Sequence, residues 1–339
     1  MNTFIEVCAG CGGMSTGFIQ AGFKPLLLNE INKVYCKTLE HNHPDIKMSQ
    51  EDVNKLDLTE YKDGVNVLVG GVPCQSFSHA GKRKGFDDDR GCLILRFGEL
   101  VKQCKPDVFV IENVKGLLTH KNKEGEKTID IVVRRLLELN PEYTIAYKLL
   151  NAYEHGVPQK RERLFIIGTK RAIVDVQYRF PVENTIDRVV LSDVILPLEE
   201  YANSPGFTYS EDKKRVMDLV PPGGCWVDLP KDVQVEYMGK ILESGGGKRG
   251  YAKRLSMDHP STTLTTSPCQ KQTEKCHPSV TRPLNIKEYA AIQTFPKDYM
   301  FYGSIAQQYA QIGNAVPVKL AHTVANSIRS YLSNTVQSG

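Results

Sequence analysis

The sequence has no apolar run long enough to cross a bilayer, and it does not open with a charged segment followed by an apolar one. Its 9 cysteines are an odd number, scattered along 339 residues, which does not match the paired framework of a small secreted domain. These absences predict free thiols in a reducing, cytoplasmic setting without membrane attachment.

The sequence also lacks cysteine and histidine residues at the spacings that common metal sites have. Cys8 and Cys11 form one C-x-x-C pair, but no second pair follows at zinc-ribbon spacing. Cys269, Cys276 and His277 fit no common site. We therefore expect no metal ion and no redox role for these residues.

The composition is that of an ordinary globular protein, with 41% hydrophobic and 24% charged residues. The length allows one large or two modest domains with a true core. A formal net charge of +4 permits an anionic partner but does not require one.

Short apolar runs alternate with helical patterns through the first half of the chain. This alternation predicts a doubly wound α/β sheet. The expected strands are Phe4–Cys8, Pro25–Asn29, Met48–Val53, Val65–Val69, Asp107–Glu112, Thr144–Leu150 and Leu164–Gly168. The first expected helix begins after the first glycine turn and ends at about Ala21. The others span Lys33–His41, Leu93–Cys104, Ile129–Leu139, Ile286–Thr294 and Val318–Tyr331.

The pattern changes after about Ala172, where the chain becomes irregular and rich in Pro, Gly, Thr and Lys as far as about Ser279. Helical periodicity returns beyond that point. We therefore predict a catalytic and cofactor-binding domain over 1–172, a smaller loop-rich domain over 173–279, and a segment over 280–339 that packs back on the first domain.

A glycine-rich turn follows the first predicted strand, in the stretch from Glu6 to Gly13. Glycines let the backbone approach a ligand, and the amino terminus of the next helix favours an anionic group. Glu30 ends the second strand, where an acid binds ribose hydroxyls, and Asp52 could accept from an adenine amine. The spacing is not G-x-G-x-x-G, so we expect an adenosine without a pyrophosphate.

The most informative stretch is Gly70 to Ser78, directly after a buried strand. Glycines allow a tight turn there, and Pro73 fixes the backbone before Cys74. A thiol at the carboxyl edge of such a sheet lies where α/β enzymes bind their ligands. The alternative interpretation is a buried structural cysteine.

Two further groups suit the same chemistry. Glu112 closes a strand and is a candidate acid, although it could instead interact with a helix dipole. Arg161 and Arg163 alternate in an extended segment, and guanidinium groups suit a phosphate and a substrate oxygen. The alternative for these arginines is a solvated charge run.

Together these stretches resemble the DNA cytosine-5 methyltransferases, and the resemblance covers the whole chain except about 172–279. The motifs occur in the family's order. They are the cofactor motif Glu6–Gly13, the nucleophile motif Pro73-Cys74-Gln75, Arg90-Gly91 with Leu93, the acid motif Glu112-Asn113-Val114, the arginine motif Gln159–Arg163, Arg282–Glu288, and the final motif Gly313–Pro317.

The resemblance implies a Rossmann-like domain that binds S-adenosylmethionine, and a smaller target recognition domain. It also implies methyl transfer to C5 of a flipped-out cytosine in a specific duplex DNA sequence, with S-adenosylhomocysteine as product. Cys74 would add to C6 of the base, Glu112 would hydrogen-bond N3, Arg163 would hold O2, and Arg161 would support the loop or a phosphate.

Further residues are assigned to ligands on the same basis. The expected cofactor contacts are Cys8, Gly10, Gly12, Gly13, Glu30, Ile31, Asp52, Pro73, Leu93, Asn314 and Ala315. The expected DNA contacts are Gln75, Ser78, Lys82, Arg83, Lys84, Arg90, Arg249, Arg254 and Thr265. Lys82, Arg83 and Lys84 lie between glycines, as expected of a lid that closes on phosphate.

The family resemblance also suggests the biological setting. The chain is similar to stand-alone bacterial or phage enzymes of restriction–modification systems, which implies a cytoplasmic, nucleoid-associated monomer and a cognate restriction endonuclease as a candidate partner. Cys8 and Ile31 replace aromatic residues of the family, so the adenine has less ring surface to pack on. The alternatives are a tRNA cytosine-5 methyltransferase and a catalytically inactive nucleic-acid-binding relative.

Overall fold

A computed structural model describes residues 1–72, 92–171, 177–183, 188–196, 202–243 and 245–336. The chain forms two compact units. Unit 1 comprises Met1–His155, Glu162–Glu183 and Val316–Gly339, and unit 2 comprises Gly156–Arg161 and Asn184–Ala315.

Unit 1 is built on a seven-stranded sheet with the order β3-β2-β1-β4-β5-β8-β6. The first five strands in this order are parallel, and β8 runs antiparallel to both β5 and β6. The predicted α/β class is confirmed. The strands are β1 (Thr3–Val7), β2 (Lys24–Asn29), β3 (Met48–Ser49), β4 (Val67–Gly70), β5 (Val108–Val114), β6 (Tyr143–Asn151) and β8 (Glu162–Lys170).

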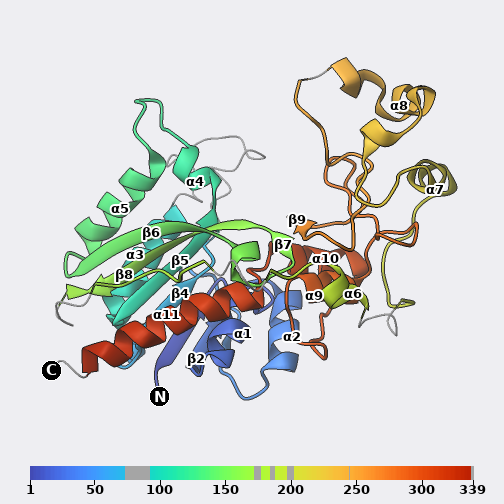
Figure 1. Cartoon of the computed structure of the whole chain (residues 1–339). Coiled ribbons are helices and arrows are strands. Elements are labelled where there is room, and N and C mark those ends of the chain that lie inside the picture. The colour runs from blue at the N-terminus through green and yellow to red at the C-terminus, as the bar shows by residue number, and fades with distance from the viewer. Residues whose placement is uncertain (73–91, 172–176, 184–187, 197–201, 244, 337–339) are drawn as a thin grey trace. The chain divides into compact units, whose positions relative to one another are not determined.

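Helices cover both faces of this sheet (Figure 1). α3 and α5 pack on one face, and α1 and α11 pack on the other. The helices and 3₁₀ turns of unit 1 are α1 (Gly13–Gln20), α2 (Lys33–Asn42), η1 (Thr59–Tyr61), α3 (Cys92–Cys104), α4 (Gly116–Thr119), α5 (Thr128–Leu139), η4 (Ala152–His155) and α11 (Val318–Val336).

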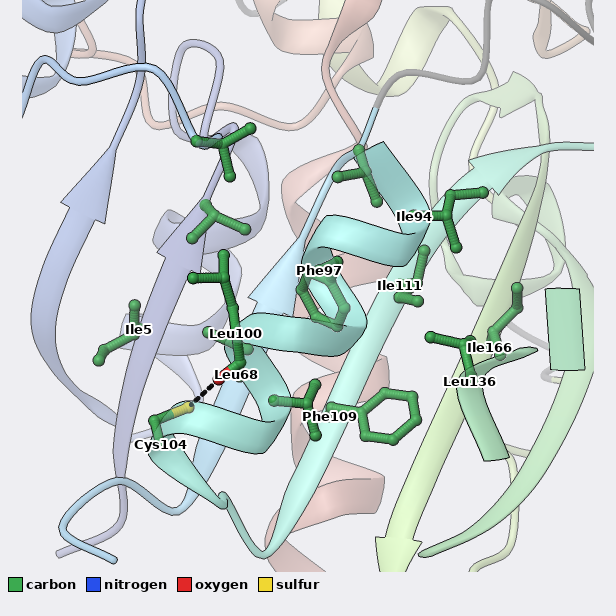
Figure 2. Packing of buried hydrophobic residues seen from close by; sticks show 14 of the residues in the cluster. Ile5, Leu68, Ile94, Phe97, Leu100, Cys104, Phe109, Ile111, Leu136 and Ile166 are labelled. Carbon is green, nitrogen blue, oxygen red and sulfur yellow. Dashed lines mark hydrogen bonds between the residues drawn. The ribbon is translucent and has the colours of Figure 1, made fainter. Parts of the chain in front are cut away.

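Side-chain alternation along β1 supplies both faces with apolar groups. Ile5 faces the cluster that Phe97 and Leu100 of α3 complete, as Figure 2 shows. Phe4 points to the other face, where its ring contacts Phe18 of α1 at 5.4 Å between centroids. Full burial of each such side chain stabilises the fold by roughly 1.5–3 kcal/mol.

A glycine permits close packing between the first and last helices. A Cβ built on Gly17 of α1 would lie 2.6 Å from the Cβ of Ala321 and from two backbone atoms of α11. Only glycine therefore fits this crossing, which holds the C-terminal helix on the sheet of unit 1.

Unit 2 is loop-rich and has a small apolar cluster around Met217 and Ala252. Its strands β7 (Gln159–Lys160) and β9 (Ser261–Thr262) pair in parallel. Its other elements are α6 (Ser192–Ile195), α7 (Glu211–Asp218), η7 (Trp226–Asp228), α8 (Lys231–Met238), η8 (Gly239–Glu243), α9 (Ile286–Ile292) and α10 (Ile305–Asn314).

The compact units divide the chain differently from the sequence-based boundaries. The stretch 280–315 belongs to unit 2, and only the part from Val316 onward belongs to unit 1. The reason is packing, because α9 and α10 pack together and Tyr309 of α10 stacks on Phe207 of the same unit. Within the described residues, no helix combines the length and apolar composition needed to cross a bilayer.

Candidate active site

The parallel strands β2, β1, β4 and β5 bring their carboxyl ends to one edge of the sheet in unit 1. The turn from Cys8 to Gly13 follows β1, and Glu30 follows β2. β5 ends with Glu112, Asn113 and Val114. Such an edge is where open α/β sheets bind their ligands.

The glycine turn has an unusual backbone. Cys8, Gly10 and Gly12 all have positive φ, at 55°, 60° and 88°. A Cβ on Gly10 would meet nothing within 4 Å, so the conformation rather than crowding favours glycine, and the space beside it is open to a ligand. Burial raises the pKa of Cys8 to about 12 and also raises that of Cys11, so both remain thiols at neutral pH.

The Glu30 carboxylate connects the turn after β1 with the turn after β2. Its Oε2 accepts a hydrogen bond from the Gly10 amide at 2.8 Å, and its Oε1 accepts one from the Asn32 amide at 2.8 Å. Burial raises the pKa of Glu30, and these backbone donors oppose that rise. Ile31, directly beside it, is 62% exposed and offers an apolar surface.

The turn that carries Asp52, another predicted cofactor contact, is fixed by hydrogen bonds from β2. The side-chain amide of Asn29 donates to the carbonyls of Ser49 and Glu51, which fixes the turn that carries Asp52. Asp52 Oδ1 accepts from the Asn54 amide at 2.9 Å. Leu93, another expected contact, packs against the core cluster of unit 1.

Sequence reasoning placed two further residues of this edge, Glu6 and Asn113, in motifs but gave neither an individual role. Glu6 is only 1% exposed, and its Oε2 has no hydrogen-bond partner among the described residues. Burial raises the pKa of Glu6 to about 8, with further increases from Glu30 and Glu112. The sequence signal that could have singled out Glu6 is an acidic residue within an otherwise apolar strand. Asn113 is also buried, and its amide donates to the Val72 carbonyl, anchoring the start of the loop after β4.

Glu112 and Arg163 form an ion pair, with 2.9 Å between Glu112 Oε1 and Arg163 Nε. Both side chains are mostly buried, at 13% and 14% exposure. The antiparallel register of β5 and β8 places Val114 opposite Arg163, and so brings the Arg163 side chain close to that of Glu112. Burial lowers the pKa of Arg163, and Glu112 opposes this change.

Arg161 has a different environment from Arg163, although the two are only two positions apart. It belongs to unit 2 and is 1% exposed. It donates to the carbonyls of Leu264 at 3.0 Å and Gly313 at 2.8 Å. This placement favours a structural role for Arg161, holding two segments of unit 2.

The expected DNA contacts in unit 2 also divide into exposed and buried groups. Arg249 is exposed. Arg254 is 5% exposed and donates to the carbonyls of Met217, Val220 and His277, which favours a structural role. Thr265 accepts the Tyr289 hydroxyl on its carbonyl, and its own hydroxyl donates to the carbonyl of Ser267.

The final motif begins at the end of α10; Gly313, Asn314 and Ala315 belong to unit 2, and the motif's last two residues belong to unit 1. A Cβ on Gly313 would lie 2.0 Å from the Thr265 carbonyl, so this glycine allows the helix end to contact the threonine-rich segment. Asn314 is exposed and Ala315 is half-buried. Their predicted contact with the cofactor stays a prediction.

The remaining predicted residues lie outside the described part of the chain. They are Pro73, Cys74, Gln75, Ser78, Lys82, Arg83, Lys84 and Arg90. The described residues contain no cluster of three or more His, Cys, Asp or Glu side chains that could hold a metal ion.

Solved structures share this fold. A protein encoded in an Escherichia coli prophage and described as a DNA modification methyltransferase aligns over 98% of this chain and 100% of its own, with a TM-score of 0.70 and 22% identity. The Entamoeba histolytica methyltransferase EhMeth aligns over 98% and 99% with a TM-score of 0.67 and 14% identity. The fold class is therefore the Rossmann-like methyltransferase class.

The family follows from the sequence comparisons. Residues 2–330 match the family described as C-5 cytosine-specific DNA methylase, and the chain belongs to this family. The Type II methyltransferase M.Eco47II of Escherichia coli is 44% identical over 333 residues, 96% of this chain and 78% of its own. M.Sau96I of Staphylococcus aureus is 44% identical, covering 97% and 76%. The predicted enzyme class, DNA cytosine-5 methyltransferase, is thereby confirmed.

Proposed function

We propose that this chain methylates C5 of a flipped-out cytosine in a specific duplex DNA sequence, through a covalent bond between Cys74 and C6 of the base. The observation that carries the proposal is the Glu112–Arg163 pair at the carboxyl edge of the sheet. It lies on β5 and β8, and β5 neighbours the strand β4, which ends four residues before Cys74 in the sequence. The pair thus supplies an acid and a cation at the edge of the sheet where β4 ends.

The chemistry on the base needs these groups in definite roles. The thiolate of Cys74 forms the Sγ–C6 bond, and the C5–C6 electron pair then makes C5 nucleophilic. Glu112, which is the ion-paired carboxylate in this structure, would take up a proton when the base binds and donate it to a hydrogen bond with N3. Arg163 would donate to O2, so that the developing charge on the ring is stabilised. After methylation, solvent water would accept the C5 proton. The C5–H electron pair then forms the C5–C6 double bond, and the electrons of the Sγ–C6 bond return to the Cys74 thiolate, which restores the aromatic ring. A base inside a duplex is stacked, so it must first be flipped out, at a cost of a few kcal/mol.

The geometry of unit 1 fits S-adenosylmethionine, which family membership implies. Glu30 would accept hydrogen bonds from the ribose hydroxyls, and Gly10 leaves space beside the turn. The exposed side chain of Ile31 would lie against the adenine, and Asp52 would accept from its amine. When bound, the cofactor supplies an electrophilic methyl group on its sulfonium.

We assign recognition of the DNA target sequence to unit 2. Arg249 is the exposed candidate for base or phosphate contact, since a guanidinium suits guanine in the major groove. Arg254 and Thr265 would act by shaping the surface that Arg249 and its neighbours present. The basic run Lys82–Lys84 would contact phosphates and carry no sequence information.

The names of the relatives support a role in a restriction–modification system. In that role the chain would act as a cytoplasmic monomer that protects host DNA from a cognate endonuclease. The tRNA methyltransferase and the inactive relative are the less favoured candidates. Transfer of labelled methyl groups to duplex DNA and to tRNA decides among the three, and bisulfite sequencing of plasmid from an expressing host identifies the methylated site. Transfer to tRNA alone, or to neither, would refute the proposal.

Replacing Glu30 by alanine should raise the dissociation constant for S-adenosylmethionine by tenfold or more, which corresponds to about 1.4 kcal/mol. The reason is the loss of ribose contacts together with the two amide contacts that shape the pocket. Calorimetry measures the effect. Glu40→Ala, an exposed change on α2, is the matched control and should leave the affinity unchanged.

An analogue without ribose hydroxyls separates the two contributions. Unaltered protein should bind this analogue more weakly than the cofactor, and the Glu30→Ala variant should bind both about equally. If the variant still distinguished the two ligands as strongly as the unaltered protein does, Glu30 would be organising the turns without touching the ribose.

A further inference from the structure

A hairpin formed by residues 120–128 joins α4 to α5 in unit 1 (Figure 1). The backbone closes it at its base, where the Thr128 amide donates to the His120 carbonyl at 3.0 Å. The His120 ring and the Thr128 hydroxyl are also hydrogen-bonded, at 2.6 Å. The two ends of the segment are therefore held together.

The tip of this hairpin is equally well organised. The Asn122 amide donates to the Glu126 carbonyl, and the Glu126 amide donates back to the Asn122 side chain at 2.8 Å. Gly125 takes a φ of 84°, which the tight turn requires. The hairpin thus presents its side chains on a rigid frame, which reduces the entropy lost on binding.

The charged side chains of the hairpin differ in whether they form ion pairs. Glu126 is engaged by Arg134 of α5, with 2.6 Å between Oε1 and the guanidinium. Lys121, Lys123 and Lys127 are all exposed, and none of them makes an ion pair within the described residues. Glu124 at the tip is the one acid of this hairpin that has no such partner there.

Folding alone does not account for the position of two of these lysines. Lys121 and Lys127 lie directly opposite each other in an antiparallel bridge. Opposed residues in such a bridge have their Cβ atoms about 4.5–5.5 Å apart on one face, and like charges there are destabilising. An anion placed between the two ammonium groups would remove this repulsion.

The hairpin also lies at the catalytic edge of unit 1. It follows β5 and the short helix α4, so it projects from the edge at which β5 delivers Glu112. From these observations we infer that Lys121, Lys123 and Lys127 bind the phosphate backbone of duplex DNA at this edge, in addition to the contacts proposed for Lys82–Lys84 and for unit 2. This inference rests on the proposed function.

The test is a salt series of DNA binding with a triple variant, Lys121→Gln, Lys123→Gln and Lys127→Gln. The slope of log K against log salt should become less steep by about 3, since three phosphate contacts are lost and each changes the slope by about 0.9. Cognate and scrambled duplexes should lose affinity by the same factor, because phosphates carry no sequence. The control replaces Lys24, Lys62 and Lys102 by glutamine, three exposed lysines near the amino ends of β2, β4 and β5.

A second variant keeps the inference testable if the triple change impairs folding. Glu124→Lys adds a charge at the tip and should steepen the slope by about 1 for both duplexes. Slopes equal to that of the control set, or a loss confined to the cognate duplex, would overturn the inference. Methyl transfer by the unaltered chain tests the proposed function separately, so a failure of the hairpin variants alone leaves that function standing.

Discussion

Replacing Cys74 by serine should reduce methyl transfer to duplex DNA below detection while leaving the fold and most DNA binding intact. A thiolate is the nucleophile that addition to C6 needs, and a serine hydroxyl is hardly ionised near neutral pH. Transfer of a labelled methyl group measures the loss. Cys269→Ser in unit 2, at a partly exposed thiol, is the matched control and should keep the unaltered rate.

Covalent trapping of the protein on DNA tests the same role of Cys74 without a measurement of turnover. The duplex carries 5-fluorocytosine at the target position and is incubated with S-adenosylmethionine. After methyl transfer, C5 bears fluorine and has no proton to lose, so the Sγ–C6 bond persists. A denaturation-resistant complex should form with the unaltered chain and with Cys269→Ser, and not with Cys74→Ser. Methylation by Cys74→Ser at nearly the unaltered rate would show that another group attacks the base.

Replacing Glu112 by glutamine should lower the rate of methyl transfer by about 10²-fold or more, the range expected for losing acid–base catalysis. Glutamine still donates a hydrogen bond, but it cannot move a proton to N3, and it cannot form the ion pair that the Glu112 carboxylate makes with Arg163. The measurement is the single-turnover rate at saturating DNA and cofactor. Glu162→Gln is the matched control, since Glu162 adjoins Arg163 and pairs with Lys115 on the surface.

A stability measurement separates chemistry from folding in this case. The Glu112–Arg163 pair is mostly buried, so removing one partner leaves a buried charge and should also lower the free energy of unfolding. Urea denaturation reports that change. If Glu112→Gln kept its rate within about threefold of the unaltered protein, the carboxylate would serve the β5–β8 pair and not the reaction.

The sequence predicted the parts of this protein that local patterns encode. Strand and helix alternation predicted the α/β class, and the expected run Val65–Val69 corresponds to β4 at Val67–Gly70. The glycine turn was placed correctly at the start of α1, and Glu112 at the end of β5. Hydrophobic period and turn residues are local signals, which explains this success.

Residue partners depend on which strands pair, and the tertiary structure alone decided them. Two arginines two positions apart were expected to share one face of an extended segment. Instead, Arg163 meets Glu112 because β8 returns antiparallel to β5, whereas Arg161 is buried among carbonyls of unit 2. Arg254 is likewise bound to carbonyls 23 to 37 positions away in sequence.

The sequence by itself therefore determined the fold class, the family motifs and their order along the chain. Only the tertiary structure decided that Glu6 is buried just before the glycine turn and that Lys121 and Lys127 oppose each other. The physical reason is that hydrophobic periodicity and turn preferences act over a few residues. Burial of a charge and the pairing of side chains depend instead on segments brought together by long-range packing.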